Sequence, residues 1–220
     1  MAGNDPRDLE LLSELVHPVP FEELRFALLR WLQDGHEAAG RAQLVRVDEH
    51  LDWRNDTSFG TDRYQYLVGT ADAFVARYEE MTADHSYGSL LIRLPRAVIY
   101  PFRVESGPHG SVRNTSDLRF ELLSESDRNE LALLKRREIL LGGRELLLLP
   151  WEGTEKSGLT GAWIGQGLLA GSQIDWTWLV RLDSESTGYA GQPETSPFDA
   201  PQPVPPLRPR TGASSEEQAG

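Results

Sequence analysis

The spacing of apolar residues changes along this 220-residue chain, and that change constrains the fold more than any other feature. Between residues 21 and 78 apolar side chains recur every three or four positions, which is typical of helix faces. From residue 89 onward, stretches rich in β-branched and aromatic residues indicate strands. The sequence therefore predicts an α+β fold, with N-terminal helices followed by a mainly antiparallel sheet that is covered on one side and has one intervening helix.

Two helices are expected before the sheet. The first begins after Pro20 and ends before Gly35, because proline favours the first turn of a helix and glycine the position after its end. The second begins at Thr61 or Asp62 and places Arg63 on its exposed, charged face. Its predicted core stripe consists of Tyr64, Leu67, Val68, Ala71, Phe74, Val75 and Tyr78.

Prolines and glycines divide the later part of the chain. Pro95 and Pro101 interrupt residues 89–104, which predicts two short strands or an edge strand, because proline lacks the N–H that a sheet ladder needs. Residues 117–123 alternate and predict a further strand. A helix capped by Asp127 is then expected to end at Gly142-Gly143.

The stretch 146–160, LLLLPWEGTEKSGLT, resembles a phosphate-binding P-loop, but Leu159 stands where that motif has its lysine. Several glycines follow within residues 161–171, where a P-loop requires a helix. We therefore predict a β-hairpin with a polar turn and no nucleotide site. A last strand is expected over 174–182, with its alternate residues on one face: Ile174, Trp176, Trp178, Val180 and Leu182.

The composition sets the domain boundary and the broad class. With 39% hydrophobic and 25% charged residues, the chain is globular, and residues 1–182 form one predicted domain. Residues 183–220 are rich in Pro, Gly, Ser and acidic residues, which predicts a disordered tail. No cysteine is present, so thiolate chemistry is excluded. No membrane span or signal peptide is recognisable, so we expect a cytoplasmic protein.

The charge distribution suggests one place for an anion. The net charge of −12 argues against a nucleic-acid partner, because phosphates would be repelled on average. Residues 89–144 are the exception: they carry 10 basic and 7 acidic residues, a net charge of +3. An anion- or nucleotide-binding domain is therefore one alternative function, with candidates Arg93, Arg96, Arg103 and Arg113.

A second alternative is a metal-assisted hydrolase. Asp48, His50, Asp52 and Asp56 lie within nine residues and offer mixed nitrogen and oxygen ligands. The spacing of a calcium loop is not met, because Gly60 falls out of frame. A solvated acidic loop before a helix explains the same residues.

The leading interpretation is a non-enzymatic protein-binding module that needs no cofactor, because the motifs of hydrolases and of dinucleotide-binding folds are absent from the sequence. Trp151 and Trp163 flank the predicted hairpin and are expected to pair across it. Aromatic side chains in such a position often anchor protein interfaces, so these two are the candidate contact residues.

Overall fold

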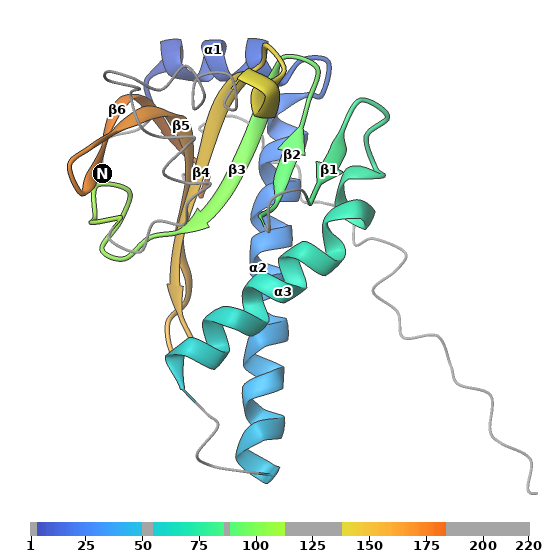
Figure 1. The fold of residues 1–220 in the computed structure, drawn as a ribbon, viewed down its shortest axis with the longest axis vertical. Coiled ribbons are helices and arrows are strands. Elements are labelled where there is room, and N and C mark those ends of the chain that lie inside the picture. Colours follow the sequence, from blue (N-terminus) through green and yellow to red (C-terminus); the bar gives the residue numbers. More distant parts are fainter. Residues whose placement is uncertain (1–3, 50–54, 86–88, 113–137, 184–220) are drawn as a thin grey trace, which may run out of the picture. The chain divides into compact units, whose positions relative to one another are not determined.

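The computed structural model describes residues 4–49, 55–85, 89–112 and 138–183. Within these ranges helices come first and strands follow, which confirms the α+β class (Figure 1). The helices are α1 (Pro6–Val16), α2 (Phe21–Glu49) and α3 (Asp56–Val75). The strands are β1 (Thr82–Asp84), β2 (Leu91–Arg93), β3 (Ala97–Arg103), β4 (Glu145–Thr154), β5 (Gly158–Ala170) and β6 (Gln173–Arg181).

The six strands of this part of the chain form one sheet in sequential order, from β1 to β6. Only β3 and β4 are parallel, and the other neighbours are antiparallel, so the predicted mainly antiparallel sheet is confirmed. A parallel pair requires a long crossover, and the chain between β3 and β4 supplies it. The strand predicted at 117–123 and the helix start at Asp127 lie outside the described residues. Residues 138–141 form one helical turn that ends before Gly142.

The sheet is apolar on both faces, so the expectation that it is covered on one side only is wrong. One face packs against α1, α2 and α3, and residues such as Ile99 and Leu147 belong to that core. The opposite face carries a second apolar cluster, in which Tyr100 and Leu148 pack with Leu140 and Val112. Because side chains alternate along a strand, β3 and β4 contribute to both clusters and are buried throughout their inner positions.

Helix α2 continues through Gly35 to Glu49, so the predicted end at Gly35 is wrong. The reason lies in its neighbour α3. A Cβ atom at position 35 would lie 2.9 Å from Cδ2 of Leu67, which means that the glycine allows the two helices to cross closely. Glycine in a helix interior costs about 1 kcal/mol relative to alanine, and helix packing outweighs that local preference here.

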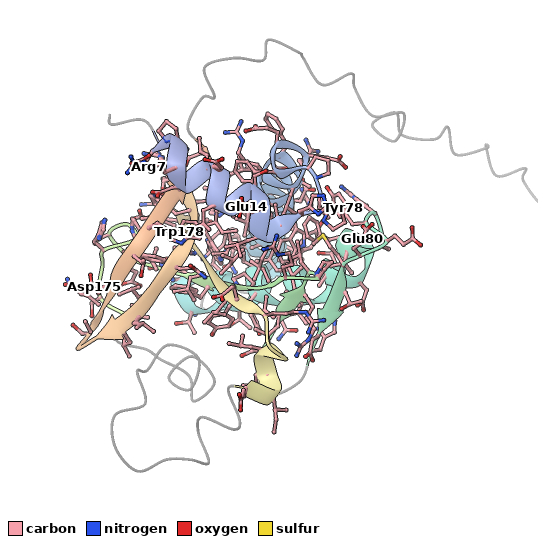
Figure 2. All side chains as sticks on the ribbon, turned by 90° about the horizontal axis from the view of Figure 1, so that it is seen from above. Arg7, Glu14, Tyr78, Glu80, Asp175 and Trp178 are labelled. Atoms are coloured by element: carbon pink, nitrogen blue, oxygen red, sulfur yellow. The ribbon has the colours of Figure 1, made fainter. Side chains whose placement is uncertain are left out.

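Helix α1 was not anticipated, although its start carries recognisable features. The Asp5 side chain accepts a hydrogen bond from the backbone N of Arg7 at 2.9 Å, and Pro6 occupies the first helical position. Leu12, Leu15 and Val16 are buried against the core. Figure 2 shows α1, marked by Arg7 and Glu14, running beside the β5–β6 hairpin, so this helix closes the β6 edge of the apolar layer.

The two tryptophans of β6 lie on opposite faces of the sheet, so the prediction of one continuous apolar face over 174–182 is wrong. Gln166 pairs with Trp178 and Gly167 with Trp176, which leaves Thr177 as an extra residue in a β-bulge. Trp178 consequently packs toward the helices, close to α1 in Figure 2, and its Nε1 donates to Oε1 of Gln166 at 2.9 Å. Trp176 packs on the opposite face and donates to the carbonyl of Pro108 at 3.0 Å.

The two prolines of residues 89–104 are accommodated differently. Pro95 lies between β2 and β3, so the prediction of two short strands is confirmed. Pro101 lies inside β3, beyond the point where β2 pairs, since that pairing involves only Val98 and Ile99 of β3. At Pro101 the strand has β4 on one side and no partner in β2 on the other, so the N–H that proline lacks is not needed for a bond to β2.

The antiparallel pair of β4 and β5 confirms the hairpin predicted within residues 146–160. The strands join through a three-residue turn, and Gly158 begins β5 with a φ of 73°. A P-loop would be followed by a helix, but residues 158–170 form strand β5. Figure 1 shows this hairpin extending to the N-terminal end of α3, and His36 of α2 contacts the carbonyl of Thr154 in the hairpin. None of the helices in the described ranges has the length and apolar character that a membrane crossing requires.

Candidate functional site

The structure buries a charged residue that sequence periodicity placed at the surface. Arg63 lies on the inner side of α3, one turn after Phe59 and one turn before Leu67, and is only 1% exposed. Its expected position on the polar face of the helix is therefore wrong. Helix α3 begins at Asp56 and is capped by Asn55, so it starts six residues before the predicted cap Asp62. Its buried stripe therefore runs through Phe59, Arg63 and Leu67.

The guanidinium of Arg63 joins three elements of the fold. Its Nη1 donates to the carbonyl of Gly153 in β4 at 3.2 Å and lies 3.2 Å from Nδ1 of His36 in α2. Its Cζ lies 3.9 Å from the centre of the Trp151 ring and 5.1 Å from that of Phe59, in cation–π geometry. The side chain thereby connects the β4–β5 hairpin to both long helices.

The charge of Arg63 has no acidic counterpart in the part of the chain that the structure describes. Its hydrogen-bonded neighbours are a carbonyl and an imidazole, both neutral, and its Nε is buried without a hydrogen-bond partner. Burial, together with the nearby charge of Arg103, lowers the pKa of Arg63 to about 9. The group is still protonated at neutral pH, so a positive charge is held in the protein interior, which is costly without an anion.

His36 is the second buried polar residue of the cluster. Its Nε2 lies 2.8 Å from the carbonyl oxygen of Thr154, which can only accept, so Nε2 carries the hydrogen. Nδ1 is then the acceptor for Arg63. Burial, and next the charge of Arg63, lower the pKa of His36, which keeps the imidazole neutral. The helix predicted to end at Gly35 left this histidine outside the core, which explains why its role was missed.

Arg103 brings a second guanidinium to the same end of the sheet. It is the last residue of β3 and lies beside Trp151 in the parallel register. Its Nη1 lies 4.0 Å from the position that a Cβ atom on Gly60 would take, so the side chain reaches α3 one turn before Arg63. Its carboxylate neighbour is Glu105, at 3.6 Å and largely exposed. Of the arginines selected from the sequence, this one contributes to the cluster.

The other three arginines do not join it. Arg93 pairs with Asp84 across β1 and β2, with Nε at 3.0 Å from the carboxylate. Arg96 donates to the carbonyl of Glu14 at 3.1 Å. It lies seven residues before Arg103, at the other end of β3, which corresponds to about 23 Å along an extended strand. Arg113 lies outside the described residues.

The acidic residues selected as metal ligands are placed only in part. Asp48 lies near the end of α2 and Asp56 at the start of α3, and both are exposed. His50 and Asp52 lie outside the described ranges. Within those ranges, no three His, Asp or Glu side chains are grouped as a metal ion would require.

Trp151 and Trp163 lie on opposite faces of the sheet, so the prediction that they pair across the hairpin is wrong. Trp151 is opposite Ala162 in the β4–β5 register and is buried against the helices, where its Nε1 has no hydrogen-bond partner within the described ranges. Trp163 is half-buried on the other face, with the guanidinium of Arg181 5.7 Å from its ring centre. Trp151 is therefore part of the Arg63 cluster, and its role as an interface anchor stays a prediction.

The sequence does contain an indication of the buried arginine. Phe59 and Leu67 lie four residues before and after Arg63, so a helix that began early enough to include Phe59 would place all three on one face.

In comparisons with known proteins, the chain matches no protein-family model, no curated protein and no solved structure.

Proposed function

We propose that the protein is a non-enzymatic, cytoplasmic protein-binding module, and that the outer face of α2 near its C-terminal end contacts the partner. The observation that supports this proposal is a pair of exposed aliphatic side chains, Leu44 and Val45, which are 63% and 57% exposed. Exposed aliphatic side chains that lie together favour association, because burial removes apolar surface from water. The proposal requires no cofactor.

The residues around this pair have the arrangement of a small interface. Arg41, Leu44, Val45 and Asp48 follow the spacing i, i+3, i+4 and i+7, so they lie on one side of the helix. Arg41 and Asp48 are both exposed. An apolar centre bordered by charged groups is the usual organisation of a protein contact surface.

The inner side of the same helical segment is held in place by α3. Gln43 is fully buried, and its Nε2 donates to the Ser58 hydroxyl at 3.0 Å and to Asp62 at 3.1 Å. Arg46 forms a bidentate ion pair with Asp62. Leu44 and Val45 are therefore presented from a segment already fixed by packing, which reduces the entropy that binding would cost.

The flanking charges define the partner. A complementary surface would place an aliphatic side chain against Leu44 and Val45, an acidic group near Arg41 and a basic group near Asp48. An amphipathic helix from another protein meets these requirements with one face.

Site-specific photocrosslinking in cells tests the proposal. A photoreactive amino acid at position 45 should yield a discrete adduct with one partner, and Leu44→Asp in the same chain should abolish it. The matched control is the photoreactive residue at position 26, since Phe26 is also on α2 and is 60% exposed. The proposal fails if position 45 gives no adduct, gives the same adducts as position 26, or keeps its adduct in the Leu44→Asp chain.

A further inference from the structure

We infer that Arg63 and Arg103 form a binding site for a small oxyanion, a carboxylate or a phosphate group, at the end of the sheet where the β4–β5 hairpin meets α3. This site is separate from the outer face of α2 and does not depend on the protein-binding proposal. The inference rests on the unpaired buried charge of Arg63, on buried donors that lack acceptors among the described residues, and on the exposed guanidinium of Arg103 beside Gly60.

No carboxylate among the described residues forms an ion pair with Arg63, whose hydrogen-bond partners are His36 and the carbonyl of Gly153. Glu105 approaches Arg103 from the surface, and Glu37 is exposed and accepts from Nε2 of Gln33 at 3.0 Å. Glu152 follows Trp151 in β4, so it points to the opposite face, where it accepts from the backbone N of Ser106 at 3.1 Å. These neighbouring carboxylates therefore leave Arg63 without a buried counter-charge, and an external anion would supply one.

Two buried N–H donors in the cluster lack acceptors among the residues that the structure describes. One is Nε of Arg63 and the other is Nε1 of Trp151, and the two side chains are stacked on each other at 3.9 Å. Native proteins seldom retain buried donors without a partner, because each such group has lost its hydrogen bonds to water. An oxyanion accepts several hydrogen bonds at once and can satisfy guanidinium donors in pairs.

The residue types also suit an oxyanion. A guanidinium stays charged when buried and presents its N–H groups in a planar fork, whereas an ammonium group is a more strongly hydrated point charge. The aromatic rings of Trp151 and Phe59 next to Arg63 exclude water, which strengthens any charge-assisted hydrogen bond formed there.

Access to Arg63 is expected along Arg103. Arg103 is exposed, and it lies against α3 at Gly60, where the helix has no side chain. An oxyanion would meet Arg103 first and then reach Arg63, which lies one turn after Gly60 in α3. Displacement of the loosely held Glu105 carboxylate would release the Arg103 guanidinium for this contact.

Titration of the full chain with acetate and with inorganic phosphate tests the site, with chloride as the reference at constant ionic strength. The thermal midpoint of unfolding should rise with at least one oxyanion and not with chloride, because the ligand binds only the folded state. Acetate and phosphate distinguish a carboxylate ligand from a phosphate ligand. Arg103→Gln should weaken binding about tenfold or more, as expected for the loss of a charge-assisted hydrogen bond.

Matched variants separate this site from general salt effects. Arg96→Gln removes another exposed arginine, at the far end of β3, and should leave the oxyanion effect unchanged. Gly60→Leu should block the route without changing any charge, and Arg63→Met should abolish binding where that variant folds. The inference is overturned if neither oxyanion raises the midpoint above chloride, or if the rise is the same in the wild-type chain and in Arg103→Gln.

Discussion

Nη1 of Arg63 lies 3.2 Å from Nδ1 of His36, so a buried guanidinium uses a neutral imidazole as a hydrogen-bond acceptor. This relationship couples the protonation of His36 to the packing of the hairpin. A protonated imidazole has no lone pair to offer, and it would place a second positive charge beside the first. The neutral form of His36 is therefore required for the structure described here.

Stability should decrease as the pH falls below about 6.5. The folded protein lowers the pKa of His36, so the unfolded chain takes up a proton at that position first. The stabilisation is complete above 6.5, is lost as the pH falls from 6.5 to the folded pKa, and levels off below it. Urea unfolding at a series of pH values measures this loss.

His36→Gln identifies the source of this pH dependence, because glutamine does not titrate and can still donate to Thr154. The difference in unfolding free energy between the wild-type chain and His36→Gln should change with pH in that window. Phe26→Gln, at an exposed position of the same helix that does not titrate, is the control and should leave the pH profile unchanged. A His36→Gln profile parallel to that of the wild-type chain would contradict the assignment.

Gly35→Ala and Gly40→Ala should change stability in opposite directions. Both glycines lie inside α2, where alanine is preferred by about 1 kcal/mol. At position 40 the added methyl group meets no atom within 4 Å, so the variant should be more stable by about 0.5–1 kcal/mol. At position 35 it meets the buried side chain of Leu67 at 2.9 Å, and overpacking of about 1–3 kcal/mol should exceed the helical gain. Chemical unfolding of both variants compares them, and equal stabilisation would disprove the close helix crossing.

Gly142→Ala and Gly143→Ala should both destabilise the protein. One glycine suffices to end a helix, so the sequence predicts a positive φ, and a clear loss of stability on substitution, at only one of the two. In the structure both have a positive φ, of 58° at Gly142 and 75° at Gly143. An alanine in this region costs about 1 kcal/mol or more. Gly69→Ala is the control, since that glycine lies in α3 with open space around it and should tolerate alanine. A neutral result at either 142 or 143 would show that the local backbone can adopt another conformation.

Removal of residues 186–220 should leave the thermal midpoint of unfolding nearly unchanged. This prediction follows from the composition of the tail, which has too few large apolar residues to offset the entropy of ordering. The comparison is a melting curve of the full chain against one that ends at residue 185. A fall of many degrees would indicate that the tail packs on the domain.

The sequence by itself determined the kinds of elements and their order. The shift from three- and four-residue spacing to strand-like stretches predicts helices followed by a sheet, and the glycines and polar residues of 153–158 predict the hairpin in place of a phosphate loop. These features are local: each depends on which side chains recur on one face, and on which residues permit a turn.

Only the tertiary structure decided where the helices end, which faces are buried and where the charges meet. Gly35 remains helical because α3 crosses at that point, and Thr177 moves Trp176 and Trp178 to opposite faces because it has no partner in β5. Arg63 is charged, and charged side chains are rarely buried, so the sequence assigns it to solvent. It is buried because α2, α3 and the hairpin meet around it, and the partners that hold it are distant in sequence. A guanidinium contact between residues 63 and 153 leaves no trace in local spacing, and for that reason the candidate site became visible only in the folded chain.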